Sequence, residues 1–171
     1  MMIVVPLLLS GLGLACSSRR NPDDISYKDN VQKALEQAEL KDVTVSEDHD
    51  RNTITLGGKV HSDDAKRAAG DGTRATAGSR IIANEISVQP VGLESEAKDV
   101  SSNLDGAIEN NYKAALIAEG LDKQRIRFDA KNGVLTLKGS VVSTPQRQEA
   151  QQLAQAVPNV QQVLNQIDVK V

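Results

Sequence analysis

The sequence predicts an α+β fold in which one small α-β-β-α-β unit occurs twice, with the helices of each unit packed on one face of a mixed three-stranded sheet. Two observations lead to this prediction. The second half of the 171-residue chain aligns with the first at an offset of 81 positions (139 − 58), which pairs Gly58 with Gly139. Within each half, helical, alternating and turn-forming segments follow in the same order. We therefore expect a tandem repeat of one domain.

The alignment of the two halves is strongest at apolar positions. Three pairs of segments carry it: Ala34–Leu35 with Ala115–Leu116, Ile54–Leu56 with Leu135–Leu137, and Asn84–Val88 with Asn165–Val169. Polar positions coincide less often. This pattern indicates two units that share a core but not a surface, because closely packed interiors respond to small changes in side-chain volume.

Each unit is expected to begin with a helix. In the first unit, Asp29 or Asn30 can cap a helix whose apolar stripe has helical spacing; the stripe consists of Val31, Ala34, Leu35 and Ala38. In the second unit, the helix is predicted to start near Leu104 and to stop at Gly120, a residue that commonly ends helices. Its apolar positions are Ile108, Tyr112, Ala115 and Leu116.

A β-hairpin follows the first helix of each unit. In Arg125–Phe128 the sides alternate, so Ile126 and Phe128 are predicted to face inward and the two arginines outward. Asn132–Gly133 favours a tight turn, which leads into the strand Val134–Gly139.

Gly58 and Gly139 end the core strand at matching places in the two units. A glycine within a strand often marks a close approach of two backbones. We therefore expect both to be structural glycines, at positions where a side chain would disturb the packing or the backbone conformation.

A second helix and a last strand complete each unit. In the second unit, Ser143 or Thr144 caps a helix that runs to Ala156, with Pro145 in its first turn. The helix of the first unit contains Gly70 and Gly72, each of which costs about 1 kcal/mol relative to alanine. We expect that helix to fray and the first domain to be the less stable one.

The N-terminal segment predicts export. Ile3–Leu14 is apolar but too short to span about 30 Å of hydrocarbon, as is typical of a signal peptide, here residues 1–15. The run Leu-Gly-Leu-Ala-Cys resembles a bacterial lipobox, which implies acylation of Cys16. Ser17, where inner-membrane lipoproteins often have Asp, implies an outer-membrane anchor by the same resemblance. The alternative is an ordinary signal peptide with an incidental cysteine.

Composition argues against several classes of protein. A net charge of −3 and an aromatic content of 2% are atypical of a nucleic-acid-binding protein. The single cysteine excludes an internal disulfide and CxxC chemistry. No motif of a hydrolase, phosphate loop or zinc helix is present, and His49 and His61 have neither ligand spacing nor a third ligand nearby. We expect no enzyme activity, cofactor or metal.

Basic residues concentrate on one predicted strand of the second unit. Lys123, Arg125, Arg127 and Lys131 lie on this strand and at its ends, and Lys113 lies on the preceding helix. A basic strip can attract anionic lipid headgroups, each charge contributing about 1 kcal/mol. The alternative is an ordinary solvated strand face.

The repeated segments together resemble the BON domain. The match rests on the strand-glycine segments Ile54–Val60 and Leu135–Val141 and on the endings Asn84–Ile86 and Asn165–Ile167. By this resemblance the chain consists of a tether (16–28), a first BON-like domain (29–90), a linker (91–99) and a second BON-like domain (100–171).

The resemblance implies a non-catalytic, lipid-anchored periplasmic module that contacts membrane phospholipid and supports envelope integrity or osmotic stress tolerance. In two-domain lipoproteins of this kind, lipid contact is placed on the second unit near its first helix. The alternative is an interaction protein that docks an envelope protein partner, with lipid contact incidental.

Overall fold

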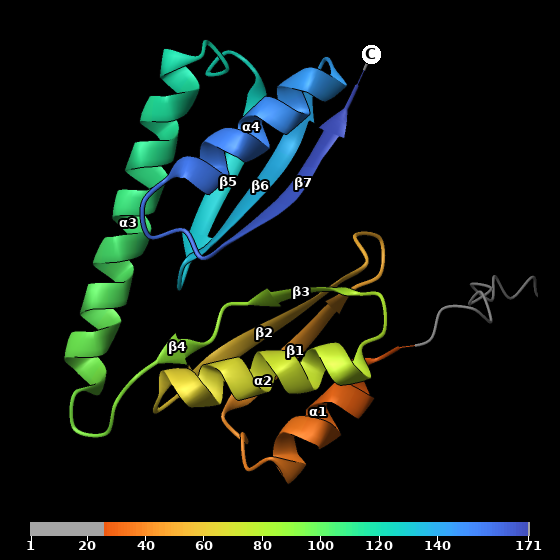
Figure 1. The fold of residues 1–171 in the computed structure, drawn as a ribbon, viewed down its shortest axis with the longest axis vertical. Helices are drawn as coiled ribbons and strands as arrows, with labels where there is room; N and C mark the ends of the chain where they lie inside the picture. Colours follow the sequence, from red (N-terminus) through yellow and green to blue (C-terminus); the bar gives the residue numbers. More distant parts are fainter. Residues whose placement is uncertain (1–25, 171) are drawn as a thin grey trace, which may run out of the picture.

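The computed structural model describes residues 26–170 and confirms the predicted α+β tandem repeat (Figure 1). The elements of the first domain are α1 (Lys28–Gln37), β1 (Val43–Asp48), β2 (Thr53–Val60), α2 (Asp63–Thr76), β3 (Ile81–Asn84) and β4 (Ser87–Val88). Those of the second are α3 (Glu94–Ala118), β5 (Arg125–Lys131), β6 (Val134–Val141), α4 (Thr144–Ala156) and β7 (Gln162–Val169). The signal peptide, Cys16 and most of the tether lie outside the described residues.

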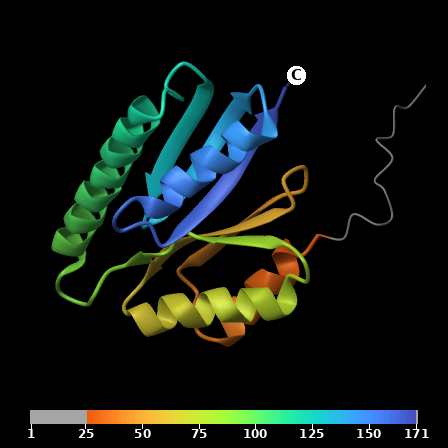
Figure 2. The same ribbon diagram turned by 45° about the horizontal axis from the view of Figure 1, so that its top comes forward.

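Both sheets are mixed. In the second domain, β5 pairs antiparallel with β6, and β6 pairs parallel with β7. The first domain has the same order, but its last strand is divided, so β3 and β4 pair separately with β2 in a four-stranded sheet. In Figures 1 and 2, α1 and α2 lie on the side of the first sheet that faces away from the second domain.

The two cores are built mainly from aliphatic side chains and alanine. The second core also holds the ring of Tyr112, which meets Phe128 edge-on with ring centroids 5.0 Å apart. Burial raises the pKa of the Tyr112 hydroxyl, which donates a hydrogen bond to the carbonyl oxygen of Ala150 on α4 at 3.1 Å. This contact ties α3 to α4 across the core.

Helix α3 begins at Glu94 and not near Leu104, so most of the predicted linker is helical. No proline or glycine interrupts residues 94–105, and Glu94 and Glu96 in the first turn favour a helix N-terminus. The buried residues of α3 are among those predicted for its apolar stripe. Ile108, Tyr112 and Leu116 face the core, whereas Leu104 is 43% exposed.

The predicted caps of α1 do not form, because the helix begins at Lys28 and no side chain caps it from its own N-terminal residue. Glu47 of β1 serves instead: its carboxylate accepts hydrogen bonds from Ser26 Oγ and the Tyr27 amide and pairs with Arg80 at 3.2 Å. Burial alone would raise the pKa of Glu47, but these hydrogen bonds and nearby His49 outweigh it and lower the pKa.

Two equivalent asparagines fasten the second helix of each domain to the last strand. Asn84 Nδ2 donates to the carbonyl oxygen of Lys66 on α2 at 2.9 Å. Asn165 Nδ2 donates to the equivalent carbonyl of Arg147 on α4 at 3.2 Å, while its Oδ1 accepts from the Ile167 amide at 3.1 Å. This shared role accounts for the recurrence of asparagine at the two endings.

Helix α2 is continuous from Asp63 to Thr76, so the structure shows no break at its glycines. Gly70 is buried, and a Cβ atom there would lie 2.9 Å from Asn84 Nδ2, whereas Gly72 faces open space. One glycine therefore makes room for the asparagine contact, and the other has no such role.

The two domains pack against each other through equivalent positions. Arg51 Nη1, in the β1–β2 turn, donates to the carbonyl oxygen of Gln166 at 2.7 Å. Asn132 Nδ2, 81 positions further along (132 − 51), donates to the carbonyl oxygen of Glu85 at 2.8 Å, and Glu85 is the equivalent of Gln166 (166 − 85 = 81). Such reciprocal contacts characterise a two-fold interface, so the repeats are related by an approximate two-fold axis.

Candidate functional site

Gly58 in β2 and Gly139 in β6 allow the edge strands to approach closely. Their φ angles are +87° and +107°, a region that disfavours side chains. A Cβ atom on Gly139 would lie 1.8 Å from the Arg125 carbonyl oxygen, and one on Gly58 would lie 2.0 Å from that of Asp42. The glycine of the second domain thus sets the path of β5 at the start of the basic strip.

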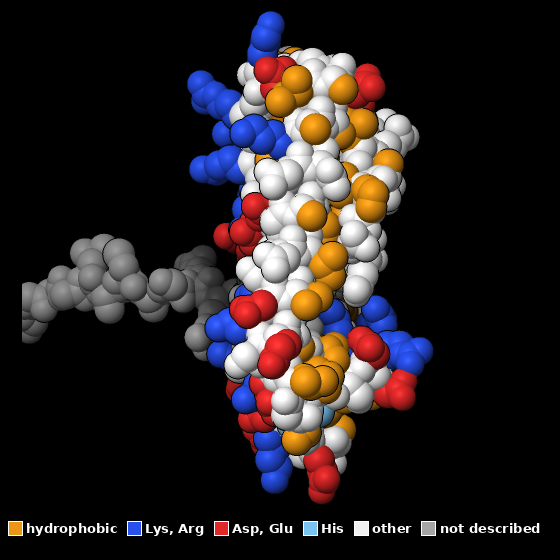
Figure 3. Space-filling view, turned by 90° about the vertical axis from the view of Figure 1, so that its left-hand side faces the viewer, with side chains coloured by type: hydrophobic (Ala, Val, Ile, Leu, Met, Phe, Trp, Pro, Cys, Tyr) orange, Lys and Arg blue, Asp and Glu red, His pale blue; other side chains and the backbone are white. Residues whose placement is uncertain are grey.

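The face of the second sheet opposite α3 and α4 packs on the first domain through Val134 and Leu164, and beyond that contact it carries a group of cations. Along β5, Ile126 and Phe128 pack into the core while Arg125 and Arg127 are exposed on the opposite face. Lys138 of β6 lies directly across from Arg127 and is also exposed. We call Arg125, Arg127 and Lys138 the basic face; Figure 3 shows Lys and Arg side chains gathered at the upper left, over the second domain.

The basic face brings two like charges together. Like charges on directly opposite strand positions destabilise a sheet, yet Arg127 faces Lys138. No salt bridge within residues 26–170 involves any of the three side chains. The three cations therefore have no salt-bridge partner among the described residues, and Asp129 is the next exposed residue on this face of β5.

The other predicted basic residues lie elsewhere. Lys131 Nζ pairs with Glu85 of the first domain at 3.2 Å and so helps to join the domains. Lys113 lies on α3 beside a shallow hollow at the β5 edge, and Lys123 is exposed in the loop before β5. Sequence reasoning missed Lys138, although pairing the strands outward from the Asn132–Gly133 turn would have placed it opposite Arg127.

The α3 residues near the expected lipid contact are buried or hydrogen-bonded, so they do not form an exposed binding surface. Ile108 and Tyr112 are fully buried in the second core. The carboxylate of Glu109 accepts a hydrogen bond from the Ala130 amide at 3.0 Å. That side of α3 therefore packs on β5 and cannot contact a ligand.

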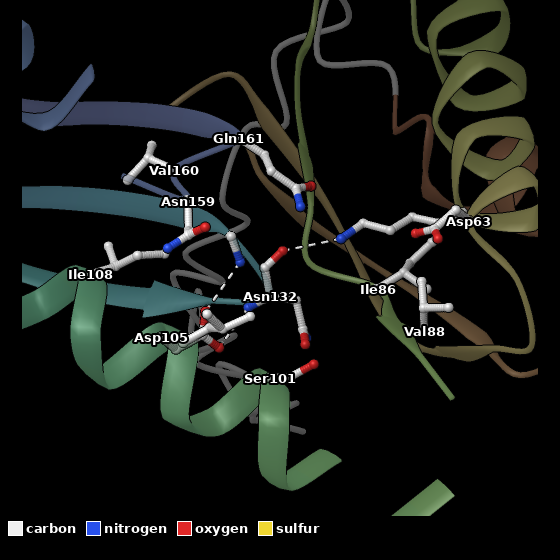
Figure 4. Close-up of a pocket in the computed structure, with 13 residues that line it drawn as sticks. Asp63, Ile86, Val88, Ser101, Asp105, Ile108, Asn132, Asn159, Val160 and Gln161 are labelled. Carbon is white, nitrogen blue, oxygen red and sulfur yellow. Dashed lines mark hydrogen bonds between the residues drawn. The ribbon is translucent and has the colours of Figure 1, made fainter. Parts of the chain in front are cut away.

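A cavity of about 400 Å³ lies between the domains (Figure 4). Lys66 Nζ donates to the Asn132 carbonyl oxygen at 3.0 Å, and Asp105 of α3 accepts from the amides of Asn132 and Gly133 at 2.7 and 3.1 Å. Burial lowers the pKa of Lys66, while Asp63 and Asp105 act in the opposite direction. These polar groups already bind one another, so the cavity is part of the domain contact.

The two histidines lie apart from these surfaces. His49 is 3.6 Å from Glu47, and His61 Nδ1 is 2.9 Å from the Gln89 carbonyl oxygen. Over residues 26–170, no group of His, Cys, Asp or Glu side chains is arranged to hold a metal ion. In the same span, no helix has the length and apolar character to cross a membrane.

Comparison with known proteins agrees with the repeat seen in the structure. The family model "BON domain" matches residues 23–90 and again residues 104–171. The chain belongs to the BON domain family. Both BON domains place the equivalent glycine, Gly58 or Gly139, opposite an edge strand.

One relative of this BON-domain chain is "Osmotically-inducible protein Y" of Escherichia coli (strain K12). It is 27% identical over 150 residues, which cover 86% of this chain and 73% of the relative. A solved structure, "CdsD - The structural protein of the Type III secretion system of Chlamydia trachomatis: C-terminal domain", matches with a TM-score of 0.35 and 12% identity, over 84% of this chain and 67% of the other.

Proposed function

We propose that this protein is a non-catalytic periplasmic module, anchored to the outer membrane through Cys16, whose second BON domain contacts anionic phospholipid. The observation that carries the proposal is the basic face, where Arg125, Arg127 and Lys138 project from one side of the sheet. Three basic residues near an anionic surface contribute about 3 kcal/mol together, at roughly 1 kcal/mol each.

The proposed biological setting is osmotic stress tolerance of the envelope. The printed name of the relative, "Osmotically-inducible protein Y", supports this setting. The lipobox-like run before Cys16 supports the anchor. Mass spectrometry of the N-terminus of the mature wild-type protein is expected to show added acyl mass on Cys16. An unprocessed N-terminus without added mass would contradict the anchor.

The lipid contact is tested by flotation of residues 17–171, which lack Cys16, with vesicles of neutral or anionic phospholipid. Wild type is expected to float with anionic vesicles only, and less so as added salt shortens the range of surface charges. Arg125→Glu with Arg127→Glu should weaken binding by at least about 30-fold, because two attractions of roughly 1 kcal/mol each are lost.

Arg67→Glu with Arg74→Glu is the matched control. It makes the same change in net charge on α2 of the first domain, where both arginines are exposed. The control is expected to float like wild type. If reversal of the basic face has no more effect than the control, the lipid contact is wrong and docking of an envelope protein partner becomes the leading function.

A further inference from the structure

The outer side of α3 is uncovered and carries large apolar side chains in its N-terminal half and alanines in its C-terminal half. The helix has 25 residues and is about 37 Å long. Leu93, at its N-terminal cap, is 56% exposed, Val100 is 58% exposed and Leu104 is 43% exposed. Figure 3 shows the hydrophobic side chains as a line that runs down this face of the molecule. The second core uses a different side of the helix.

Seven apolar residues and Asn111, all exposed except the half-buried Ala97, repeat with alternating spacings of four and three residues. The first half of the repeat is Leu93, Ala97, Val100 and Leu104. The second half is Ala107, Asn111, Ala114 and Ala118. This period of 3.5 residues is that of the a and d positions of a coiled coil, in which two helices wind around each other. We call these eight positions the α3 seam.

We infer that the α3 seam pairs with the same helix of a second copy of this chain, in antiparallel orientation. In that orientation every a position meets a d position of the partner. Each leucine then meets an alanine: Leu104 meets Ala107, and Leu93 meets Ala118. Val100 meets Asn111, and Ala97 meets Ala114. Parallel pairing would place Leu104 on Leu104 and Ala107 on Ala107, which leaves a crowded layer beside an empty one.

Charges at the N-terminal end of α3 also favour the antiparallel pair. Glu94 and Glu96 are both in the first turn. Parallel pairing would bring these carboxylates of both copies to one end, together with the two positive helix N-termini. Antiparallel pairing separates the two acidic turns by the length of the helix and sets each helix N-terminus beside a C-terminus.

The side chains in and around the α3 seam fit a helix as binding partner better than a membrane surface. Asn103 and Asn110 flank it, and no lysine or arginine lies among its eight positions. Helices that lie on membranes have cationic flanks and bulky apolar side chains, whereas here alanines form half of the seam. Small residues allow two helix backbones to approach closely. The seam is separate from the basic face on β5 and β6, so each surface can act without the other.

The association is tested by sedimentation of residues 17–171 over a range of concentrations. A concentration-dependent dimer is expected. Leu104→Glu should raise the dimer dissociation constant by at least about 100-fold, because each dimer would bury two unpaired carboxylates. Ser102→Glu, on an exposed side of α3 away from the seam, is the matched control and should leave it unchanged. A wild type that stays monomeric at every concentration overturns the inference.

The orientation is tested with single cysteines, since residues 17–171 contain none. Oxidation of a mixture of Ala97→Cys and Ala114→Cys proteins is expected to give a mixed disulfide, because these positions meet in the antiparallel pair. Neither protein alone should crosslink. Crosslinking of each protein with itself overturns the antiparallel assignment. Absence of the mixed disulfide also counts against it. This measurement does not depend on how Leu104→Glu folds.

Discussion

Two neighbouring glycines in α2 should respond in opposite ways to the same substitution. Gly72 is exposed within a continuous helix, and a Cβ atom there would have no atom within 4 Å. Gly72→Ala should therefore stabilise the first domain by about 1 kcal/mol, the difference in helix propensity between the two residues. For a domain of about 60 residues, that change corresponds to a rise in melting temperature of about 8 °C.

Gly70→Ala gains the same propensity but loses a contact. Its Cβ atom would lie 2.9 Å from Asn84 Nδ2, which now donates to the Lys66 carbonyl oxygen. Moving that amide leaves partly buried polar groups unpaired, at a cost of roughly 1–3 kcal/mol. The net effect should be between no change and a loss of about 2 kcal/mol.

The assay is thermal and urea unfolding of the two single variants beside wild type, followed by circular dichroism. The predicted order of stability is Gly72→Ala, then wild type, then Gly70→Ala. If Gly70→Ala stabilises the domain as much as Gly72→Ala does, the asparagine contact does not restrict this position. Asn84 would then not depend on a glycine at position 70 for its contact with Lys66.

Two further predictions concern other strained or charged positions. Gly139→Ala should destabilise the second domain by at least about 3 kcal/mol, because its Cβ atom would overlap the Arg125 carbonyl and its φ is +107°. Lys138→Ala, at an exposed position, should change stability by less than about 0.5 kcal/mol. Equal melting temperatures for these two variants would contradict the reasoning. The lowered pKa of Glu47 means that its charge stabilises the fold above the unfolded-state pKa and that this contribution is lost as pH falls through the folded-state pKa. The gap in melting temperature between wild type and Glu47→Gln should therefore narrow in acid, and a gap that does not change with pH would refute the role of the charge.

Local patterns were sufficient to predict the elements of the fold. The cap, first-turn proline and terminal breaker of α4 predicted its bounds, Thr144–Ala156, as the structure has them. The Asn132–Gly133 turn and the alternation of Arg125–Phe128 predicted the second hairpin and its inward residues. These features could be predicted because helix, strand and turn preferences depend on residues within a few positions of one another.

The partners of individual side chains required the tertiary structure. Lys131 belongs to the predicted basic strip by sequence, but Glu85, 46 positions earlier (131 − 85), neutralises it across the domain contact. The cap of α1 comes from Glu47, which follows the helix in sequence and lies on another element. Such pairs are set by how strands and domains pack, and no periodicity in the chain encodes them.

The two apolar stripes of α3 also differ in whether the sequence or the tertiary structure determined them. The sequence predicted the stripe Ile108–Tyr112–Leu116 and the repeat of one BON unit. It did not predict the stripe Val100–Leu104–Ala107, because the helix was expected to start near Leu104. Either stripe could satisfy the local pattern of a buried face. The choice between them depends on where β5 and α4 lie, because a helix buries the side that meets the rest of the core. Only packing of the whole domain leaves the Leu104 stripe uncovered.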